Sequence, residues 1–195
     1  MRLRAVLQPV IAVASAAALT GCLFSETVET FGGPTMGSTY SVKFVKTASA
    51  PSTERLQAEV EAVLAEVDRQ MSTYRPDSDL EGFNRAAAGC HAMPAPVLGL
   101  VEFGTGLSRK SEGAFDLTLE PLLTLWGFGA KSRGQVIPDA AALAAVREQY
   151  GYQRLQVRDG QLCKDLDAVQ VDLNSIAAGY TVDRVAALLE SRGVG

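Results

Sequence analysis

Two short blocks of this sequence combine residue types that bind nucleotides in proteins. They are Gly113-Ala-Phe-Asp116 and Asp172-Leu-Asn-Ser-Ile-Ala-Ala-Gly-Tyr180. In the first block, Gly113 permits close approach of a ligand to the backbone, Phe115 has an aromatic face for stacking on a base, and Asp116 supplies a carboxylate. On pattern alone the simpler interpretation is favoured, in which Phe115 belongs to the core and Asp116 caps a short helix.

The second block is predicted to join a strand to a helix. The strand covers residues 169–172, and the helix starts at Asn174-Ser175, two residue types that favour N-caps, and runs to Gly193. Backbone N–H groups at the start of such a helix, together with the Asn174 side chain, can bind a phosphate or a ribose. A backbone carbonyl facing the same space can bind a hard cation such as Mg²⁺. On pattern alone, a plain N-cap role for Asn174 is favoured.

Tyr74 is a third candidate for nucleotide binding. It lies between Thr73 and Arg75 in the polar segment 72–79, where Pro76 prevents continuation of a helix and small polar residues favour turns and caps. A functional loop is therefore expected there. The pattern does not distinguish a stacking platform from a tyrosine packed within the loop.

The scarcity of histidine excludes several classes of enzyme. His91 is the only histidine, so the chain has no HExxH zinc site, and a Ser-His-Asp hydrolase would depend on that one residue without a GxSxG motif. The sequence also contains neither a GxGxxG between a strand and a helix nor a GxxxxGK(S/T) motif. Any nucleotide site must therefore differ from a Rossmann site or a P-loop.

The elements that would position these residues follow from hydrophobic periodicity and turn chemistry. One of them is an amphipathic helix from Glu54 to Met71, because its apolar residues recur at helical spacing. Asp159-Gly160 supplies a type I′ turn for a hairpin over residues 154–164. The other expected elements are a glycine-rich loop over residues 31–39, a half-buried strand over 40–44, and helices over 97–111 and 139–150.

Residues 1–21 are predicted to be a signal peptide. Arg2 and Arg4 form a basic start, and the apolar run that follows is too short to span a bilayer as a stable helix. Leu19-Thr-Gly-Cys22 is similar to the bacterial lipobox, which makes Cys22 a predicted lipid-attachment site; an ordinary signal peptide with a chance cysteine is the alternative. Residues 22–30 would then form a tether that holds the folded part at a membrane surface outside the cytoplasm.

The net charge and the length of the chain indicate which partners it can bind and how many domains it forms. The chain of 195 residues has a net charge of −4, which becomes −6 when Arg2 and Arg4 are removed with the signal peptide, and this argues against binding to nucleic acid. One globular domain over residues 31–195 is expected.

An oxidising compartment would permit Cys90 and Cys163 to pair, but the sequence leaves this open and favours two unpaired side chains.

Five features of the chain occur in the order found in one protein family. They are the lipobox, Met36-Gly-Ser-Thr-Tyr40, Met71-Ser-Thr-Tyr-Arg75 with Ser78-Asp-Leu80 and Phe83-Asn84, the block from Gly113 to Gly129, and the block from Asp172 to Asp183. In these features the chain resembles the ApbE family of FAD:protein FMN transferases. The resemblance implies an α+β fold, a single domain of mixed sheet with packed helices. It also implies Mg²⁺-dependent transfer of FMN from FAD to a threonine or serine hydroxyl of a partner redox protein, with release of AMP.

The resemblance assigns roles to individual residues. Those expected to contact FAD are Met36, Tyr74, Ala114, Phe115, Asp116, Asn174 and Tyr180, with Tyr74 as a stacking partner. Ala177 is expected to bind Mg²⁺ through its backbone carbonyl. No covalent enzyme intermediate is required, which agrees with the scarcity of histidine and reactive cysteine. The family favours the periplasmic face of the inner membrane of the bacterial cell envelope over the outer membrane.

The chain departs from the family pattern at two positions and beyond its last block. Ala178 stands where many members carry lysine, and Leu117 replaces a frequent proline. The family continues past the last helix into a strand, a histidine-containing segment and an Asp/Thr pair that completes the metal site, so a C-terminally truncated form is expected. Two other functions stay open: a flavin-binding lipoprotein that transfers nothing, and a non-enzymatic solute-binding lipoprotein.

Overall fold

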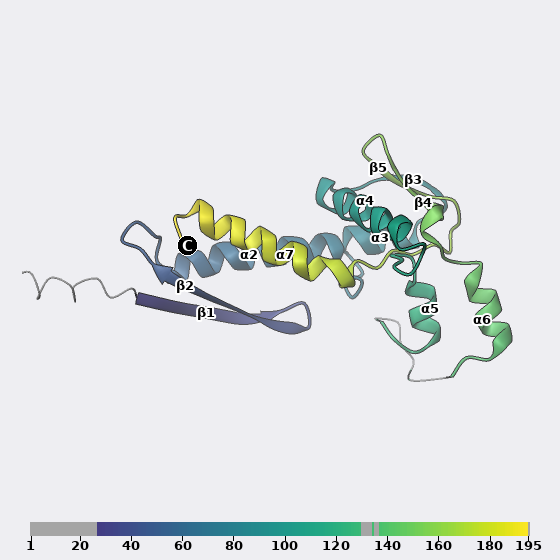
Figure 1. The fold of residues 1–195 in the computed structure, drawn as a ribbon, viewed down its shortest axis with the longest axis horizontal. Coiled ribbons are helices and arrows are strands. Elements are labelled where there is room, and N and C mark those ends of the chain that lie inside the picture. Colours follow the sequence, from purple (N-terminus) through teal and green to yellow (C-terminus); the bar gives the residue numbers. More distant parts are fainter. Residues whose placement is uncertain (1–26, 130–133, 135–136, 195) are drawn as a thin grey trace, which may run out of the picture.

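The computed structural model describes residues 27–129, 134 and 137–194 (Figure 1). The predicted signal peptide and Cys22 lie outside the described residues. Helices and strands are mixed along the chain, as in the expected α+β fold. They are β1 (Thr27–Thr35), β2 (Ser38–Lys46), α2 (Thr53–Met71), α3 (Asp79–Arg85), β3 (Gly89–Ala92), α4 (Ala95–Lys110), α5 (Glu120–Leu125), α6 (Ala140–Arg147), the 3₁₀ helix η2 (Tyr152–Arg154), β4 (Leu155–Arg158), β5 (Gln161–Lys164) and α7 (Asn174–Ser191).

β1 and β2 form a long antiparallel hairpin, which corrects the expectation of a glycine-rich loop in this region. The strands pair along their whole length, and only Met36 and Gly37 form the turn. Aromatic contact stabilises the pairing, since the ring of Phe31 on β1 lies edge-on to that of Phe44 on β2, with 6.0 Å between centroids. β1 also takes in the last residues of the predicted tether.

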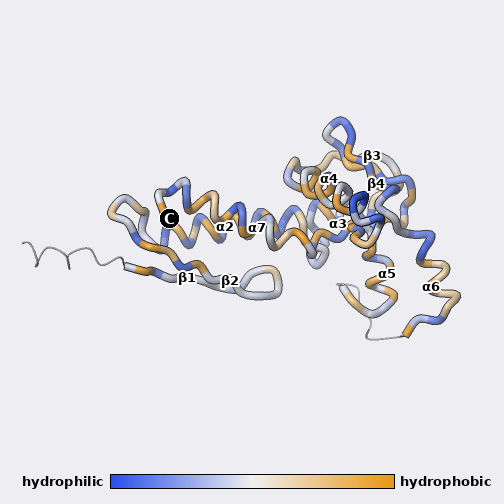
Figure 2. Tube along the Cα trace, viewed as in Figure 1, coloured by the Kyte–Doolittle hydropathy of each residue, from blue (hydrophilic) through white to orange (hydrophobic). Residues whose placement is uncertain are grey.

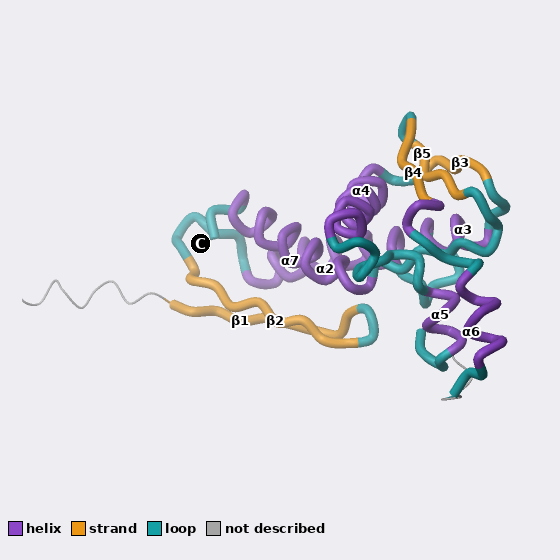
Figure 3. The backbone as a smooth tube through the Cα atoms, turned by 45° about the vertical axis from the view of Figure 1, so that its right-hand side comes forward, coloured by secondary structure: helices purple, strands orange, loops and turns teal. Residues whose placement is uncertain are grey.

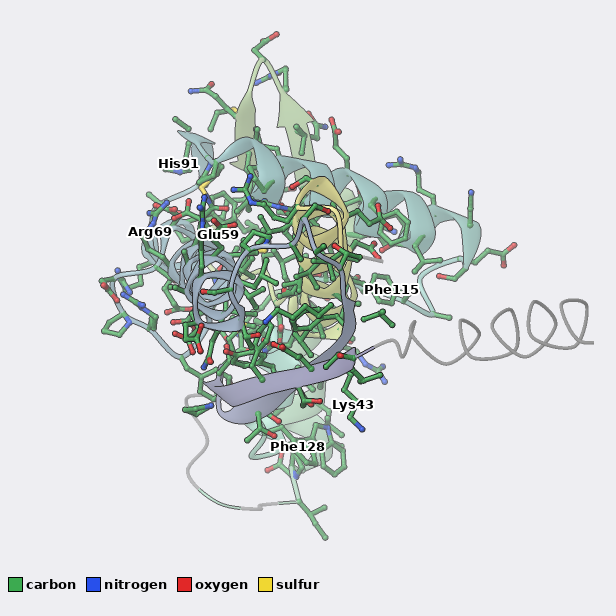
Figure 4. The ribbon with its side chains drawn as sticks, turned by 90° about the vertical axis from the view of Figure 1, so that its left-hand side faces the viewer. Lys43, Glu59, Arg69, His91, Phe115 and Phe128 are labelled. Atoms are coloured by element: carbon green, nitrogen blue, oxygen red, sulfur yellow. A yellow bond between two sulfur atoms is a disulfide. The ribbon has the colours of Figure 1, made fainter. Side chains whose placement is uncertain are left out.

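α2 and α7 lie side by side over the hairpin (Figures 1 and 4). α2 confirms the predicted amphipathic helix, because hydrophobic and hydrophilic residues alternate along it (Figure 2) and its buried residues share one face. Leu56, Val60 and Leu64 on that face form a cluster with Phe31 and Phe44 of the hairpin. Each fully buried apolar side chain stabilises this packing by roughly 1.5–3 kcal/mol.

A three-stranded antiparallel sheet in the order β3-β5-β4 lies away from the hairpin (Figure 3). β4 and β5 confirm the second predicted hairpin, and its turn residues Asp159 and Gly160 have φ of 52° and 72°, as a type I′ turn requires. Cys90 on β3 and Cys163 on β5 lie directly opposite each other and form a disulfide. The sequence favoured two unpaired cysteines, and this expectation is wrong because the pairing of β3 with β5 brings them together.

The main core lies beside this sheet, with Leu80, Phe83, Val101 and Leu162 fully buried in it. α4 and α6 confirm the other two predicted helices, although α6 ends at Arg147, earlier than expected. α3 and α5 are short helices that no periodicity had indicated. None of the helices in the described part of the chain is long and apolar enough to cross a membrane.

Residues 169–173 cross the main core between β5 and α7 without forming a strand, which corrects the strand predicted for residues 169–172. The side chain of Asn84 takes the place of a neighbouring strand. Its Nδ2 donates to the Val171 carbonyl at 3.0 Å, and its Oδ1 accepts from the Val171 N–H at 2.7 Å. Both backbone groups of Val171 are thus satisfied by one carboxamide, and no second strand is needed.

Candidate functional site

A cavity of about 550 Å³ lies where the turn of the β1–β2 hairpin meets the end of α2 and the start of α7. Four of the predicted site residues line it, namely Met36, Tyr74, Asn174 and Ala177. The volume is within the range of pockets that hold small molecules and cofactors. The other residues that line it are Gly37, Val67, Asp68, Met71, Ser72 and Arg75.

The hairpin turn brings Met36 to the cavity. Met36 and Gly37 have φ of 43° and 73°, the left-handed values that a two-residue turn between paired strands requires. Glycine adopts such values freely, whereas a residue with a Cβ does so at a cost of roughly 1–2 kcal/mol. Met36 is 45% exposed, so its thioether is accessible to a ligand. Local strain at a side chain that lines a cavity is consistent with a binding role.

Tyr74 projects from a loop that serine hydroxyls hold in place. Ser72 Oγ accepts a hydrogen bond from the Tyr74 N–H at 3.1 Å, and Ser78 Oγ donates to the Ser72 carbonyl at 2.6 Å. The Ser78 hydroxyl also caps α3 by accepting from the Glu81 N–H. Tyr74 itself is 66% exposed. The structure thus excludes the packed loop tyrosine and leaves the ring free to stack on a flat ligand.

Arg75 supplies positive charge at the cavity and is not among the predicted contacts. Its guanidinium lies 3.1 Å from Asp68 on α2 and 2.8 Å from Asp77 in the loop. Hydrogen bonds to these carboxylates raise the pKa of Arg75 further above its usual range, and Arg75 lowers the pKa of Asp77. The exposed pairs add little stability. They hold the Arg75 guanidinium at the cavity wall. In the sequence, only its position directly after Tyr74 indicates that Arg75 could belong to the site.

Asn174 lines the cavity from the first turn of α7 but does not cap that helix. The N-cap position is Leu173, whose side chain makes no capping hydrogen bond. Asn174 Nδ2 donates to Thr73 Oγ1 at 3.3 Å, and the Asn174 N–H donates to Asp172 Oδ1 at 2.6 Å. The predicted N-caps at Asn174 and Ser175 are therefore wrong, because Asp172 makes the turn into the helix.

Ala177 lines the same cavity from α7, and its carbonyl oxygen accepts a hydrogen bond from Thr181 Oγ1 at 2.6 Å. Mg²⁺ takes about six oxygen ligands in near-octahedral geometry, several of which can be water. In the part of the chain that the structure describes, no group of three or more His, Cys, Asp or Glu side chains comes together. The role of Ala177 as a magnesium ligand stays a prediction.

The first predicted block, Ala114, Phe115 and Asp116, does not line this cavity. The Asp116 carboxylate accepts hydrogen bonds from the Thr118 N–H and hydroxyl at 2.8 and 2.6 Å, and from the Tyr152 N–H at 2.9 Å. The carboxylate thus ties the turn after α4 to the start of η2. The simpler interpretation expected Asp116 to cap a short helix, but the N-cap position of α5 is Leu119. Phe115 is half-buried against the main core. Contact of these three residues with FAD stays a prediction.

Tyr180 and His91 also lie outside the lining of this cavity. Tyr180 is half-buried against the main core, and its hydroxyl accepts a hydrogen bond from Arg184 at 2.7 Å. His91, labelled in Figure 4, is hydrogen-bonded through Nε2 to the Ala87 carbonyl at 2.9 Å and lies edge-on to Phe83. The flavin contact of Tyr180 stays a prediction, and the one histidine of the chain has structural partners.

A buried polar network holds the segment that leads to Asn174. Lys164, at the end of β5, donates from Nζ to the carbonyl of Asn84 and to two carbonyls that follow β5, at 3.1, 3.1 and 3.0 Å. Removal of its ammonium group from water lowers the pKa of Lys164. Asn84 in turn pairs with Val171, three residues before Asn174. Neither Lys164 nor Asn84 was predicted to support the site, because both act on segments distant in sequence.

Comparison with known proteins assigns this arrangement to a family. The model of the ApbE family matches residues 36–195, which is most of the chain. This chain belongs to the ApbE family. Its curated relatives include proteins named FAD:protein FMN transferase from Vibrio cholerae, 38% identical over 94% of this chain, and from Haemophilus influenzae, 36% identical over 93%.

Solved structures of ApbE proteins have the same fold over the part they share with this chain. One is a flavinyl transferase of Pseudomonas stutzeri, in its apo form, with 53% identity and a TM-score of 0.84 over 88% of this chain. Another is a flavin transferase of Vibrio cholerae, with 38% identity and a TM-score of 0.85 over 87% of this chain. The chain covers 54% and 55% of those two structures and 55% of the Vibrio cholerae curated relative. It therefore spans about half the length of the proteins that it matches.

Proposed function

We propose that this chain provides the flavin-dinucleotide site of an FAD:protein FMN transferase. The observation that carries the proposal is the meeting of Met36, Tyr74, Asn174 and Ala177, from three separate motifs, around one cavity of about 550 Å³. Relatives named FAD:protein FMN transferase support it. The same family membership makes a solute-binding lipoprotein the weaker alternative.

In the proposed reaction, a threonine or serine hydroxyl of a partner redox protein attacks the FMN phosphorus of FAD. The bond from that phosphorus to the bridging oxygen breaks, AMP leaves, and the hydroxyl proton is transferred to the leaving phosphate or to solvent. Such a transfer needs alignment and charge neutralisation rather than a protein nucleophile. This requirement fits a cavity that carries no nucleophile held by a general base.

The described residues have separate parts in binding. The exposed ring of Tyr74 stacks on a flat ring of FAD, and the side-chain amide of Asn174 donates to its phosphates. Arg75 adds positive charge at the wall of the cavity. Mg²⁺ would neutralise phosphate charge when bound, and the Ala177 carbonyl is the ligand that the family resemblance suggests for it.

We place the protein, as part of the same proposal, at the periplasmic face of the inner membrane, where Cys22 would carry the lipid anchor. The predicted export signal supports this location, and the Cys90–Cys163 disulfide agrees with an oxidising compartment. Labelling of cells with a radioactive fatty acid tests it. Incorporation that is lost in Cys22→Ala supports the anchor, and equal labelling of both forms contradicts it.

The test of function mixes the full chain with FAD, Mg²⁺ and an acceptor domain that carries a flavinylation-site threonine, followed by in-gel flavin fluorescence. A fluorescent acceptor band is the expected result. FAD affinity is measured in parallel by quenching of flavin fluorescence. Retention of FAD without a band would support a flavin-binding protein that transfers nothing, and failure to bind FAD would contradict both functions.

Tyr74→Ala tests the site itself. Stacking on an aromatic ring contributes about 1–3 kcal/mol, so the variant is expected to bind FAD at least about fivefold more weakly. Phe103→Ala is a matched control, because Phe103 on α4 is 61% exposed, similar to Tyr74 at 66%, and lies outside the cavity lining. Equal FAD affinity of the two variants would contradict the placement of the site.

A further inference from the structure

The disulfide between Cys90 and Cys163 lies on the face of the three-stranded sheet that points away from the main core. The two cysteines are directly opposite each other on β3 and β5, and the next pair along these strands is His91 with Leu162. Leu162 is fully buried in the main core. Because successive side chains of a strand point to opposite faces, the disulfide lies on the outer face of the sheet. The β4–β5 hairpin that carries Cys163 projects from the rest of the fold (Figures 1 and 3).

A cavity of about 270 Å³ lies over this disulfide. Cys90 and Cys163 both line it, together with polar side chains such as Gln153 and Gln156. The two sulfur-bearing residues differ in access, since Cys90 is partly exposed and Cys163 is only 9% exposed. A thiol that approaches from solvent therefore meets Cys90 first. Access is one of the factors that decide whether a disulfide undergoes exchange with thiols.

Arg158 places a positive charge beside the more accessible sulfur. Its Nη2 donates to Cys90 Sγ at 3.4 Å, and its exposed side chain lines the same cavity. Within the described part of the chain, Arg158 has no carboxylate partner, whereas Arg154 in the same lining forms an ion pair with Asp165 at 3.4 Å. The nucleophile in thiol–disulfide exchange is a thiolate anion, which a neighbouring arginine attracts and stabilises.

We propose that Cys90–Cys163 is a redox modification site, a disulfide that dithiol reductants open in the folded protein by attack on Cys90, with Arg158 attracting the incoming thiolate. In the first step a thiolate of the reductant bonds to Cys90 Sγ, the bond between Cys90 and Cys163 breaks, and Cys163 leaves as a thiolate that takes up a proton. The second thiolate of the reductant then attacks the reductant sulfur of this mixed disulfide, and Cys90 leaves as a thiolate beside Arg158. The reductant loses two electrons and becomes a disulfide, and its two protons end on the two cysteines.

The sheet keeps its pairing when the disulfide is open, which makes the modification reversible. Cys90 and Cys163 form only one of four residue pairs between β3 and β5, and β4 pairs with the other edge of β5. Leu162 remains anchored in the main core on the opposite face. The two thiols therefore stay opposite each other, and their high effective concentration favours closure when an oxidant is supplied. The proposal needs no flavin transfer, so its outcome is independent of the proposed activity.

The test treats the full chain with dithiothreitol under native conditions and follows the appearance of thiols by maleimide labelling and mass spectrometry. A rate proportional to the concentration of dithiothreitol and insensitive to low concentrations of urea is expected, because the folded protein is attacked. A rate that rises with urea as steeply as the unfolding equilibrium would overturn the proposal, since only unfolded chains would then react. Resistance to reduction for as long as the fold persists would overturn it as well.

A thiol with a single sulfur identifies the position of attack, because the reaction then stops at the mixed disulfide. The protein is treated with 2-mercaptoethanesulfonate, the released thiol is blocked with N-ethylmaleimide, and the peptides are analysed by mass spectrometry. The sulfonate adduct is expected on Cys90 and the maleimide on Cys163. Predominance of the reverse labelling would contradict attack on Cys90.

Variants of the two arginines test the part played by charge. The rate with the anionic 2-mercaptoethanesulfonate is divided by the rate with the cationic thiol cysteamine, so that changes in access cancel. Arg158→Gln is expected to lower this ratio by about two- to fivefold, the effect of one exposed charge in water, and Arg158→Lys to retain it. Arg154→Gln is the matched control, because Arg154 lines the same cavity but is paired with Asp165. An unchanged ratio in Arg158→Gln, or an equal fall in Arg154→Gln, would overturn the role of Arg158.

Discussion

Removal of the Asn84 side chain is expected to destabilise the fold without removing any side chain that lines the candidate site. Asn84 is buried, and its carboxamide pairs with both backbone groups of Val171, at 3.0 and 2.7 Å. Asn84→Ala leaves a buried N–H and a buried C=O without a partner. Each such group costs about 1–3 kcal/mol, so the expected loss is about 2–6 kcal/mol. This is a large part of the 5–15 kcal/mol that typically stabilises a domain.

Urea unfolding followed by circular dichroism measures this loss, with Asn174→Ala as the matched control. The chain has only these two asparagines. The Asn174 side chain makes one hydrogen bond, to Thr73 at 3.3 Å, so its removal is expected to cost about 0.5–1.5 kcal/mol. FAD affinity, measured where both variants are folded, is expected to rank them in the opposite order, because Asn174 lines the cavity and Asn84 does not.

A free-energy loss below about 1 kcal/mol in Asn84→Ala would refute this reasoning, since it would mean that the two groups of Val171 find other partners or water at little cost. A loss equal to that of Asn174→Ala would refute it as well. A large loss with unchanged dependence of the free energy on urea concentration would confirm it, because the extent of the unfolding transition would be the same in both proteins.

Two further predictions concern the part of the fold around β3, β4 and β5. Changing both Cys90 and Cys163 to serine is expected to lower the free energy of unfolding by up to about 4 kcal/mol, because the disulfide closes a loop with a sequence separation of 73; equal unfolding midpoints under oxidising conditions would contradict this. Gly104→Ala is expected to destabilise α4 by about 1–3 kcal/mol, because its Cβ would lie 2.3 Å from Leu117. Gly99→Ala on the same helix meets nothing within 4 Å and is expected to be neutral or stabilising, so equal thermal midpoints for the two alanine variants would contradict the packing argument.

Elements with a strong local signal were predicted correctly. The apolar spacing along α2 needs only one face to be buried, and Asp159-Gly160 favours a type I′ turn whatever surrounds it. The β1–β2 hairpin was missed over its first strand because glycine and proline near Met36 suggest a loop. Aromatic residues such as Phe31 restore pairing there through contacts with the opposite strand.

The candidate site was predicted in part. Met36, Tyr74, Asn174 and Ala177 meet around one cavity, as residues of a common site should. Their roles in binding FAD and Mg²⁺ stay predictions. The expected N-cap at Asn174 is wrong because Asp172 makes that turn, which depends on how residues 169–173 cross the core.

By itself, the sequence determined the family, the amphipathic helix and the turn chemistry, because these depend on neighbouring residues and on the order of short motifs. Tertiary structure alone decided that Cys90 pairs with Cys163, that Asn84 replaces a strand beside Val171, and that the hairpin turn reaches the start of α7. Each of these depends on a contact between segments far apart in the chain. Such contacts form only when burial of the whole core offsets the entropy of closing long loops, and no local pattern carries that information.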